Sequence, residues 1–374
     1  MPATTTDQLQ YQIALTLIPG VGAVNARKLL AHSGSAEALF REKKSSLSKI
    51  HGVGDFIIGS LANYKEQLER AEKEIEFIER NKVTTYFFTD DNYPFRLKQC
   101  ADCPVLIYSL GTADLDSKYI VSVVGTRKAT DYGTEMCHTI IKGLADLGVL
   151  IVSGLAYGID TSAHKFALDV SLPTVGVLAH GLDRIYPRTN TQLAKKMLQN
   201  GGLVTEFMSR TEPDRENFPM RNRIIAGLSD ATIVVEAGSK GGALITADIA
   251  NSYNRDVFAV PGRVSDSYSE GCNNLVKTNR AALVQKAEDI MYIMGWDRES
   301  TKPKPAQQKL FLQLEPDQET IVNILKQSGD CSIDKLCLES LFTPTKVAAV
   351  LLSLEFEGII KSLPGKIYKL NGRI

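Results

Sequence analysis

The chain has 374 residues, more than the roughly 100–200 residues typical of one domain, so two or three domains are expected. Hydrophobic residues make up 44% and charged residues 23% of the chain, which is typical of a globular protein and argues against a disordered or fibrous one. The chain has 43 lysines plus arginines and 43 aspartates plus glutamates, so its net charge gives no sign of a nucleic-acid partner. A DNA-binding surface needs only a local basic strip, however, and the net charge conceals such a strip.

Targeting and cysteine signals are weak. Residues 1–17 lack the basic and then apolar segments of a secretory signal, and no run reaches the roughly 18 apolar residues that span a bilayer. We therefore expect a cytoplasmic protein without a membrane partner.

Six scattered cysteines suit a reducing compartment. Cys100 and Cys103 form a CxxC pair, but no second pair follows, so we interpret them as ordinary thiols and expect no metal and no cofactor.

Residues 1–80 predict a small all-α module of tandem helix-hairpin-helix or SAM-like type. Two similar glycine-containing signals, IPGVG at 18–22 and IHGVG at 50–54, each lie between helical patterns. Backbone amides in such a turn can face a phosphate. A glycine-rich turn between two packed helices also needs no ligand, and the sequence leaves both interpretations open.

Residues 81–298 predict an extended Rossmann-like domain, after a charged helix over 66–80 and a short strand over 84–89. Short apolar runs predict buried strands at 119–124, 149–152, 174–178, 203–205, 231–235 and 257–260. Helical patterns lie between them at 132–147, 161–168, 191–198, 221–227 and 243–253. Continuous apolar strands that alternate with helices indicate a doubly wound, mainly parallel sheet in an α/β fold.

The end of the chain predicts a linker and a third domain. Residues 299–312 are polar, contain prolines and show no periodic pattern, which is typical of a linker. Within 313–374, three short helices at 318–327, 333–338 and 345–357 precede two strands at 358–361 and 366–370, separated by Pro364 and Gly365. This order indicates a winged-helix domain. The helix expected to read DNA has Lys346 as its only base, so a protein contact is at least as well supported as groove reading.

Residues that follow the predicted strands are the candidates for ligand binding, since open α/β sheets bind ligands beyond the carboxyl ends of their strands. One glycine and a hydroxyl precede Arg127 in Gly125-Thr126-Arg127, and the next strand ends in Ser153-Gly154. The segment from Asn217 joins an aromatic ring to two arginines, a combination that can stack a base and hold phosphates. Basic residues follow several strands and are expected to converge on one rim: Arg127, Arg188, Arg221, Arg223, Lys240 and Arg263.

Five blocks, in order, resemble the DNA-processing-A (DprA/Smf) family. They are VVGTRKATDYG at 123–133, SGLAYGIDTSAH at 153–164, GLDRIYP at 181–187, NFPMRNRIIAGLSDATIVVEA at 217–237 and DVFAVPG at 256–262. The likeness is strong over about residues 93 to 290. Two departures are local: Gly241-Gly242-Ala243 stands where the family usually has Ser-Gly-Ser, and Lys277-Thr278-Asn279 where Gly-Ala commonly follows the lysine.

The resemblance implies a homodimer of Rossmann-like domains that binds single-stranded DNA and helps to load the RecA recombinase in natural transformation. It suggests Gly125, Thr126 and Arg127 for a phosphate pocket. Beside that pocket it suggests Phe218, Arg221, Asn222, Arg223, Lys240 and Gly241.

The alternative is a Rossmann-like enzyme that acts on nucleotides, such as a lysine-decarboxylase-like phosphoribohydrolase. That enzyme class should carry a Pro-Gly-Gly-x-Gly-Thr loop, and Lys240-Gly241-Gly242 does not match it. A dinucleotide oxidoreductase fits less well, because Gly125-Thr126-Arg127 is not GxGxxG. Asp160, His164, Glu206 and Glu236 are titratable and follow strands, but no spacing pairs them, so we assign no catalytic residue and expect a binding protein. A carboxylate in a strand-end turn more often caps a helix, as Asp160 before Thr161 could.

Overall fold

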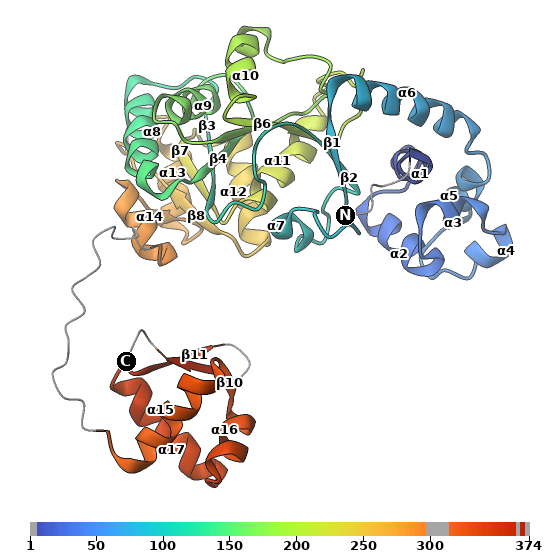
Figure 1. The fold of residues 1–374 in the computed structure, drawn as a ribbon. Helices are drawn as coiled ribbons and strands as arrows, with labels where there is room; N and C mark the ends of the chain where they lie inside the picture. The colour runs from blue at the N-terminus through green and yellow to red at the C-terminus, as the bar shows by residue number, and fades with distance from the viewer. Residues whose placement is uncertain (1–5, 297–313, 364–366, 371–374) are drawn as a thin grey trace. The chain divides into compact units, whose positions relative to one another are not determined.

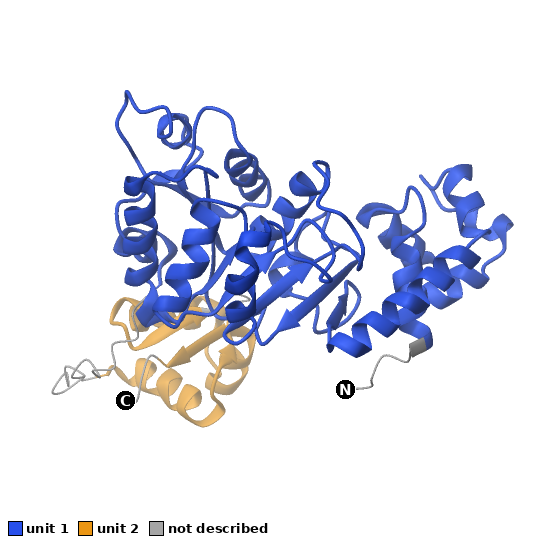
Figure 2. Ribbon diagram, turned by 90° about the horizontal axis from the view of Figure 1, so that it is seen from above, with its two compact units in different colours: residues 1–299 blue, residues 300–374 orange. Residues whose placement is uncertain are grey.

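The computed structural model describes residues 6–296, 314–363 and 367–370, and the chain divides into two compact units, residues 1–299 and 300–374 (Figure 2). The linker predicted at 299–312 and the turn at Pro364 and Gly365 lie outside the described residues.

Nine strands of the described chain form one sheet in the order β1-β2-β6-β5-β4-β3-β7-β8-β9 (Figure 1). The first two strands are antiparallel to their neighbours, and the other pairs are parallel. The strands are β1 (Thr84–Phe87), β2 (Leu106–Gly111), β3 (Ile120–Gly125), β4 (Leu150–Ser153), β5 (Thr174–Val177), β6 (Gly201–Thr205), β7 (Ala231–Glu236), β8 (Asp256–Ala259) and β9 (Ala282–Leu283). The predicted mainly parallel sheet is confirmed.

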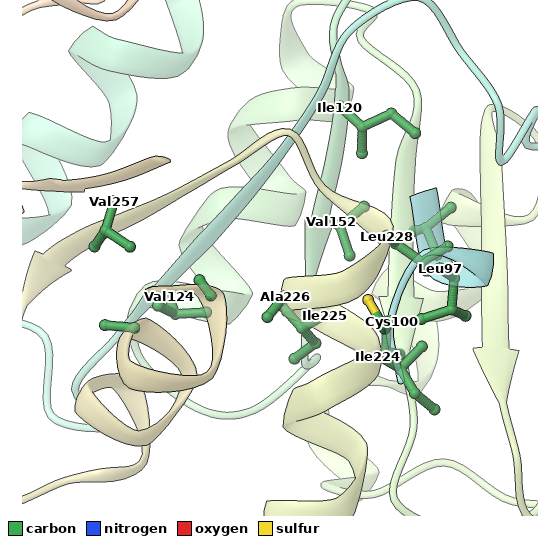
Figure 3. Packing of buried hydrophobic residues seen from close by; sticks show 14 of the residues in the cluster. Leu97, Cys100, Ile120, Val124, Val152, Ile224, Ile225, Ala226, Leu228 and Val257 are labelled. Atoms are coloured by element: carbon green, nitrogen blue, oxygen red, sulfur yellow. The ribbon is translucent and has the colours of Figure 1, made fainter. Parts of the chain in front are cut away.

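Helices cover both faces of this sheet. One core joins strand side chains to α7 (Phe95–Lys98), α11 (Asn217–Leu228), α12 (Gly242–Ser252) and α13 (Glu270–Lys277). The other face packs on α8 (Asp131–Gly143), α9 (Ile159–Asp169) and α14 (Ala287–Met294). Figure 3 shows Ile225, Ala226 and Leu228 of α11 among the buried side chains of the first core. Successive strand residues alternate between the two cores, as the pleat requires, so the strands read as continuous apolar runs.

The six predicted buried strands are present as β3 to β8, and α10 (Thr191–Met197) stands where a helix was expected. The antiparallel edge was not predicted, because 104–108 was interpreted as a connecting segment. Residues from Leu106 onward form β2 because they pair with β6, where Tyr108 lies opposite Thr205.

Residues 6–81 fold into helices joined by short turns, in agreement with the all-α prediction for this part of the chain. They are α1 (Thr6–Thr16), α2 (Ala23–Ser33), α3 (Ala36–Arg41), α4 (Lys44–Leu47), α5 (Asp55–Leu61) and α6 (Lys65–Asn81). The two GVG turns join α1 to α2 and α4 to α5. The tip of the exposed Lys28 side chain on α2 lies beside the second turn, 2.8 Å from where a Cβ at Gly52 would be. The core of these helices also includes Phe87, Leu106 and Tyr108, which makes it continuous with the edge of the sheet.

The second unit has the winged-helix order that the sequence predicts. Its elements are α15 (Pro316–Ser328), β10 (Cys331–Ser332), α16 (Ile333–Ser340), α17 (Pro344–Phe356), β11 (Ile360–Leu363) and β12 (Ile367–Leu370). The three strands pair in the order β10-β12-β11. No single helix among the described residues has both the length and the apolar character of a membrane span; α16 and α17 meet these criteria only as a pair bent by 111°.

Candidate functional site

A cavity of about 350 Å³ opens at the carboxyl edge of the sheet, where β3 and β7 end. Three segments line most of it: the turn after β3, the first half of α11, and the loop that leads into α12. Eight of the residues proposed from the sequence lie around it: Gly125, Thr126, Arg127, Phe218, Arg221, Asn222, Lys240 and Gly241. Strand ends that are far apart in sequence therefore build one pocket.

The turn after β3 is held by its backbone. Thr126 donates its amide to the carbonyl of Glu236 at 2.7 Å, and its own carbonyl accepts the Ile159 amide at 3.2 Å. Gly158 permits this approach, because its φ is +75° and a Cβ there would lie 2.2 Å from the Thr126 oxygen. The exposed Arg127 is thus presented from a rigid base.

Phe218 lies close to two guanidinium groups. Its ring centroid is 5.3 Å from Cζ of Arg127 and 5.8 Å from Cζ of Arg221. Both separations suit a cation–π contact. Exposed Tyr186, on the loop after β5, packs tilted against the same ring with centroids 6.2 Å apart. The mouth of the pocket thus combines an aromatic surface with positive charge.

Arg221 is a buried cation in the pocket wall, only 4% exposed. Its Nη1 donates to the carbonyls of Gly154 and Val177 at 2.5 Å each. Burial lowers the pKa of Arg221 to about 10, and the charge of Arg127 adds to this effect while Asp160 opposes it. The side chain stays charged at neutral pH, so it contributes a fixed positive potential.

The loop before α12 supplies the opposite wall. Lys240 is exposed, and Gly241, just before the helix, has an extended backbone and open space around the position of a Cβ. Asn222 Nδ2 donates to the Gly242 carbonyl at 3.4 Å, which ties α11 to this loop. Thr246, one turn further along α12, also lines the pocket and was not proposed from the sequence. Its i+4 spacing from Gly242 is the signal that would have identified it.

Asp160 lies within α9 and does not cap it, in contrast to the role that its position in the sequence suggested. The helix begins at Ile159 after Gly158, and the Asp160 carboxylate accepts the amides of Gly154 at 3.1 Å and Ala156 at 3.4 Å. These amides are therefore used within the loop. Burial raises the pKa of Asp160, against the effect of Arg221.

Five further residues proposed from the sequence lie outside the pocket lining. Ser153 is buried and donates its hydroxyl to Val123, while Gly154 lies beneath Arg221 and leaves no room for a Cβ. Asn217 donates its side chain to the Glu212 carbonyl, and Arg188 is exposed in a short 3₁₀ turn. Arg223 pairs with Glu206 and donates to the Asp102 carbonyl.

The expected single rim of six basic residues therefore holds only in part. Arg127, Arg221 and Lys240 meet at this pocket, whereas Arg263 lines a different cavity with Asp131 and Tyr132.

The remaining titratable candidates have structural partners. Glu236 accepts the Thr130 amide at 2.9 Å and its hydroxyl at 2.6 Å, at the start of α8. His164 is fully buried and contacts the Thr174 hydroxyl at 2.7 Å. Within the described residues, no three histidine, cysteine, aspartate or glutamate side chains gather as metal ligands. The arrangement is suited to holding an anionic, ring-containing ligand.

Fold and site together define a doubly wound α/β protein with a cationic, aromatic pocket at the carboxyl edge of its sheet, followed by a winged-helix domain. Residues 82–295 match the family model described as DNA recombination-mediator protein A, and residues 301–366 match the DprA winged helix domain. The chain belongs to the DNA-processing-A (DprA/Smf) family.

Relatives and solved structures agree with this assignment. The chain is 36% identical to Protein Smf of Synechocystis over 292 residues, which cover 76% of this chain and 72% of that protein. It is 41% identical to the DNA processing protein DprA of Bacillus subtilis over 56% of this chain and 70% of that protein. The DNA processing protein A of Streptococcus pneumoniae superimposes with a TM-score of 0.66 at 31% identity, covering 78% of this chain and 98% of that one. For the Helicobacter pylori protein, which has a single-stranded-DNA binding mode, the TM-score is 0.52 at 29% identity, with 57% and 95% covered.

Proposed function

We propose that this protein binds single-stranded DNA without sequence specificity in the cytoplasm, acts as a homodimer, and promotes loading of the RecA recombinase during natural transformation. The observation that carries the proposal is the Phe218 ring within cation–π distance of Arg127 and Arg221, in a pocket that Lys240 also lines. Every base has a π-face, so stacking on a ring discriminates little between sequences, and the cations suit phosphates. The single-stranded-DNA binding of the Helicobacter pylori relative supports the same ligand.

The role of the two exposed cations is tested by salt dependence. Arg127→Ala and Lys240→Ala should each weaken binding to oligo(dT), and each lost phosphate contact should reduce the slope of log affinity against log salt by about 0.7. Lys142→Ala is the matched control, because this exposed lysine lies at the end of α8, away from the carboxyl edge. Slopes equal to that of the control in both pocket variants would rule out this pocket.

Phe218→Ala tests stacking in the same assay. If the ring stacks a base, the variant should lose about 1–3 kcal/mol of binding free energy while the salt slope stays that of the parent protein. An unchanged affinity would assign Phe218 to packing alone.

The nucleotide-hydrolase alternative has less support, because the strand-end carboxylates have structural partners. Glu236 binds Thr130, Glu206 pairs with Arg223, and Asp160 binds loop amides. Incubation with nucleoside monophosphates should release no free base. The RecA role is tested by the rate at which RecA filaments form on single strands coated with a single-strand-binding protein. This rate should rise when the present protein is added.

A further inference from the structure

A second basic cleft, of about 230 Å³, lies between helix α6 and the loops that follow β5 and β6. The helix contributes Lys73, Phe77 and Arg80, and the loop after β6 contributes Arg210. Lys73, Arg80 and Arg210 are exposed, and among the described residues their side chains form no ion pair. The cleft therefore offers three cations to a ligand, beside an aromatic ring.

The carboxylates at this cleft leave the positive charge in excess. Asp183 pairs with Arg184 at 3.1 Å and also accepts the Arg210 amide at 2.8 Å. Glu76 is the other carboxylate of the lining. An anion that enters the cleft thus meets more cationic than acidic groups.

The cleft is rigidly built. Buried Glu74 of α6 accepts the Ser209 amide at 2.8 Å and the Ser209 hydroxyl at 2.6 Å, and it pairs with Arg70 at 2.9 Å. Arg70 in turn donates to the Ser209 carbonyl at 2.6 Å. These bonds lock the helix to the loop that carries Arg210, whose φ of +69° is a conformation that costs energy for a residue with a Cβ. The cation is presented by a fixed backbone.

The cleft and the first pocket share one edge of the sheet. The first pocket lies beyond β3 and β7, and the cleft lies beyond β5 and β6, with β4 between them. Neighbouring strands are about 4.8 Å apart, so β7 and β6 are separated by roughly 19 Å. The loop after β5 contributes Asp183 to the cleft, and three residues further on its exposed Tyr186 packs on Phe218 of the first pocket. A few nucleotides of extended single strand would span this distance.

We propose that the cleft of α6 is a second contact for the backbone of the same DNA strand, so that the N-terminal helical module takes part in binding. This inference rests on the proposed function. A strand held at the first pocket would pass Tyr186 and place its phosphates against Lys73, Arg80 and Arg210.

The test compares oligonucleotide lengths with the full chain. Oligo(dT) of about two nucleotides is too short to reach both sites, whereas about twenty nucleotides cover both. Lys73→Ala/Arg210→Ala should leave binding of the short oligomer unchanged. It should weaken binding of the long oligomer roughly three- to tenfold and reduce its salt slope by about 1.4. Lys142→Ala/Lys195→Ala, which removes two exposed lysines near the ends of α8 and α10, is the charge-matched control.

The outcomes separate the two proposals. Lys240→Ala should weaken binding at both lengths, whereas the cleft variant should act on the long oligomer alone. If the cleft variant binds the long oligomer as the control does, the second contact is overturned and the first pocket stands. If the unmodified protein binds neither oligomer, the proposed function fails and the cleft loses its ligand.

Photo-crosslinking of a long oligomer carrying 4-thiothymidine should label the α6 segment that contains Phe77. Labelling confined to the first pocket would contradict a DNA path through the cleft.

Discussion

At the scale of single residues, the first pocket depends on a close approach between the turn after β3 and the turn before α9. Gly158→Ala would place a Cβ 2.2 Å from the Thr126 oxygen at a φ of +75°. We expect the variant to lose at least about 2 kcal/mol of unfolding free energy and most of its oligo(dT) binding. Urea denaturation followed by fluorescence of Trp296, the chain's one tryptophan, which packs on Tyr119, measures the first effect.

Gly241→Ser is the contrasting variant, because an added Cβ at that glycine meets open space and the backbone is extended. It should fold as the parent protein does. An equal loss of stability in both variants would show that the approach at Gly158 is not what matters.

A second prediction at this scale concerns pH. Burial lowers the pKa of His164 to about 3 from 6.5, and Arg221 adds to the effect. As pH falls, the unfolded chain takes up the proton first, so the stability contributed by neutral His164 is complete above pH 6.5 and is lost between 6.5 and about 3. We expect the unfolding free energy to fall by about 2 kcal/mol from about pH 7 to about pH 5. His164→Gln should show a weaker pH dependence; the same dependence in that variant would argue against this assignment.

At the scale of elements, α6 joins the N-terminal helices to the sheet through one buried carboxylate. Glu74→Gln removes the charge that Arg70 and Ser209 share, and we expect a loss of about 1–3 kcal/mol. Amide hydrogen exchange in α6 should accelerate, while exchange in α9 should not. Glu72→Gln, at an exposed position of the same helix, is the control and should change neither rate. Unchanged exchange in the Glu74 variant would mean that apolar packing alone holds α6.

At the scale of the whole molecule, the first pocket and the cleft both belong to residues 1–299. In the second unit, the exposed side of α17 carries Ala348, Ala349, Leu352 and Phe356, and Lys346 is paired with Asp317 at 2.8 Å. Such a helix offers few groups to phosphates. A chain that ends at residue 299 should therefore bind oligo(dT) within about twofold of the full chain and with the same salt slope. A markedly smaller slope would place the winged-helix domain on the DNA.

Local patterns in the sequence determined the elements and part of the site. The apolar runs that became β3 to β8 could be located because a buried parallel strand needs a continuous apolar run. Arg127 and Lys240 could be proposed because parallel strands end at one edge, so residues that follow them meet there. The antiparallel strand β2 could not, because its pairing with β6 depends on a segment about a hundred residues away.

Only the tertiary structure decided which side chains face the ligand. Arg221 and Arg223 are two positions apart on α11, and residues with that spacing do not share a helix face. One lines the pocket and the other pairs with Glu206. The cleft at α6 could likewise not be predicted from the sequence, because Glu74 and Ser209, which hold it together, are 135 residues apart. Short-range periodicity specifies a helix or a strand, but which faces meet depends on packing between segments far apart in the chain.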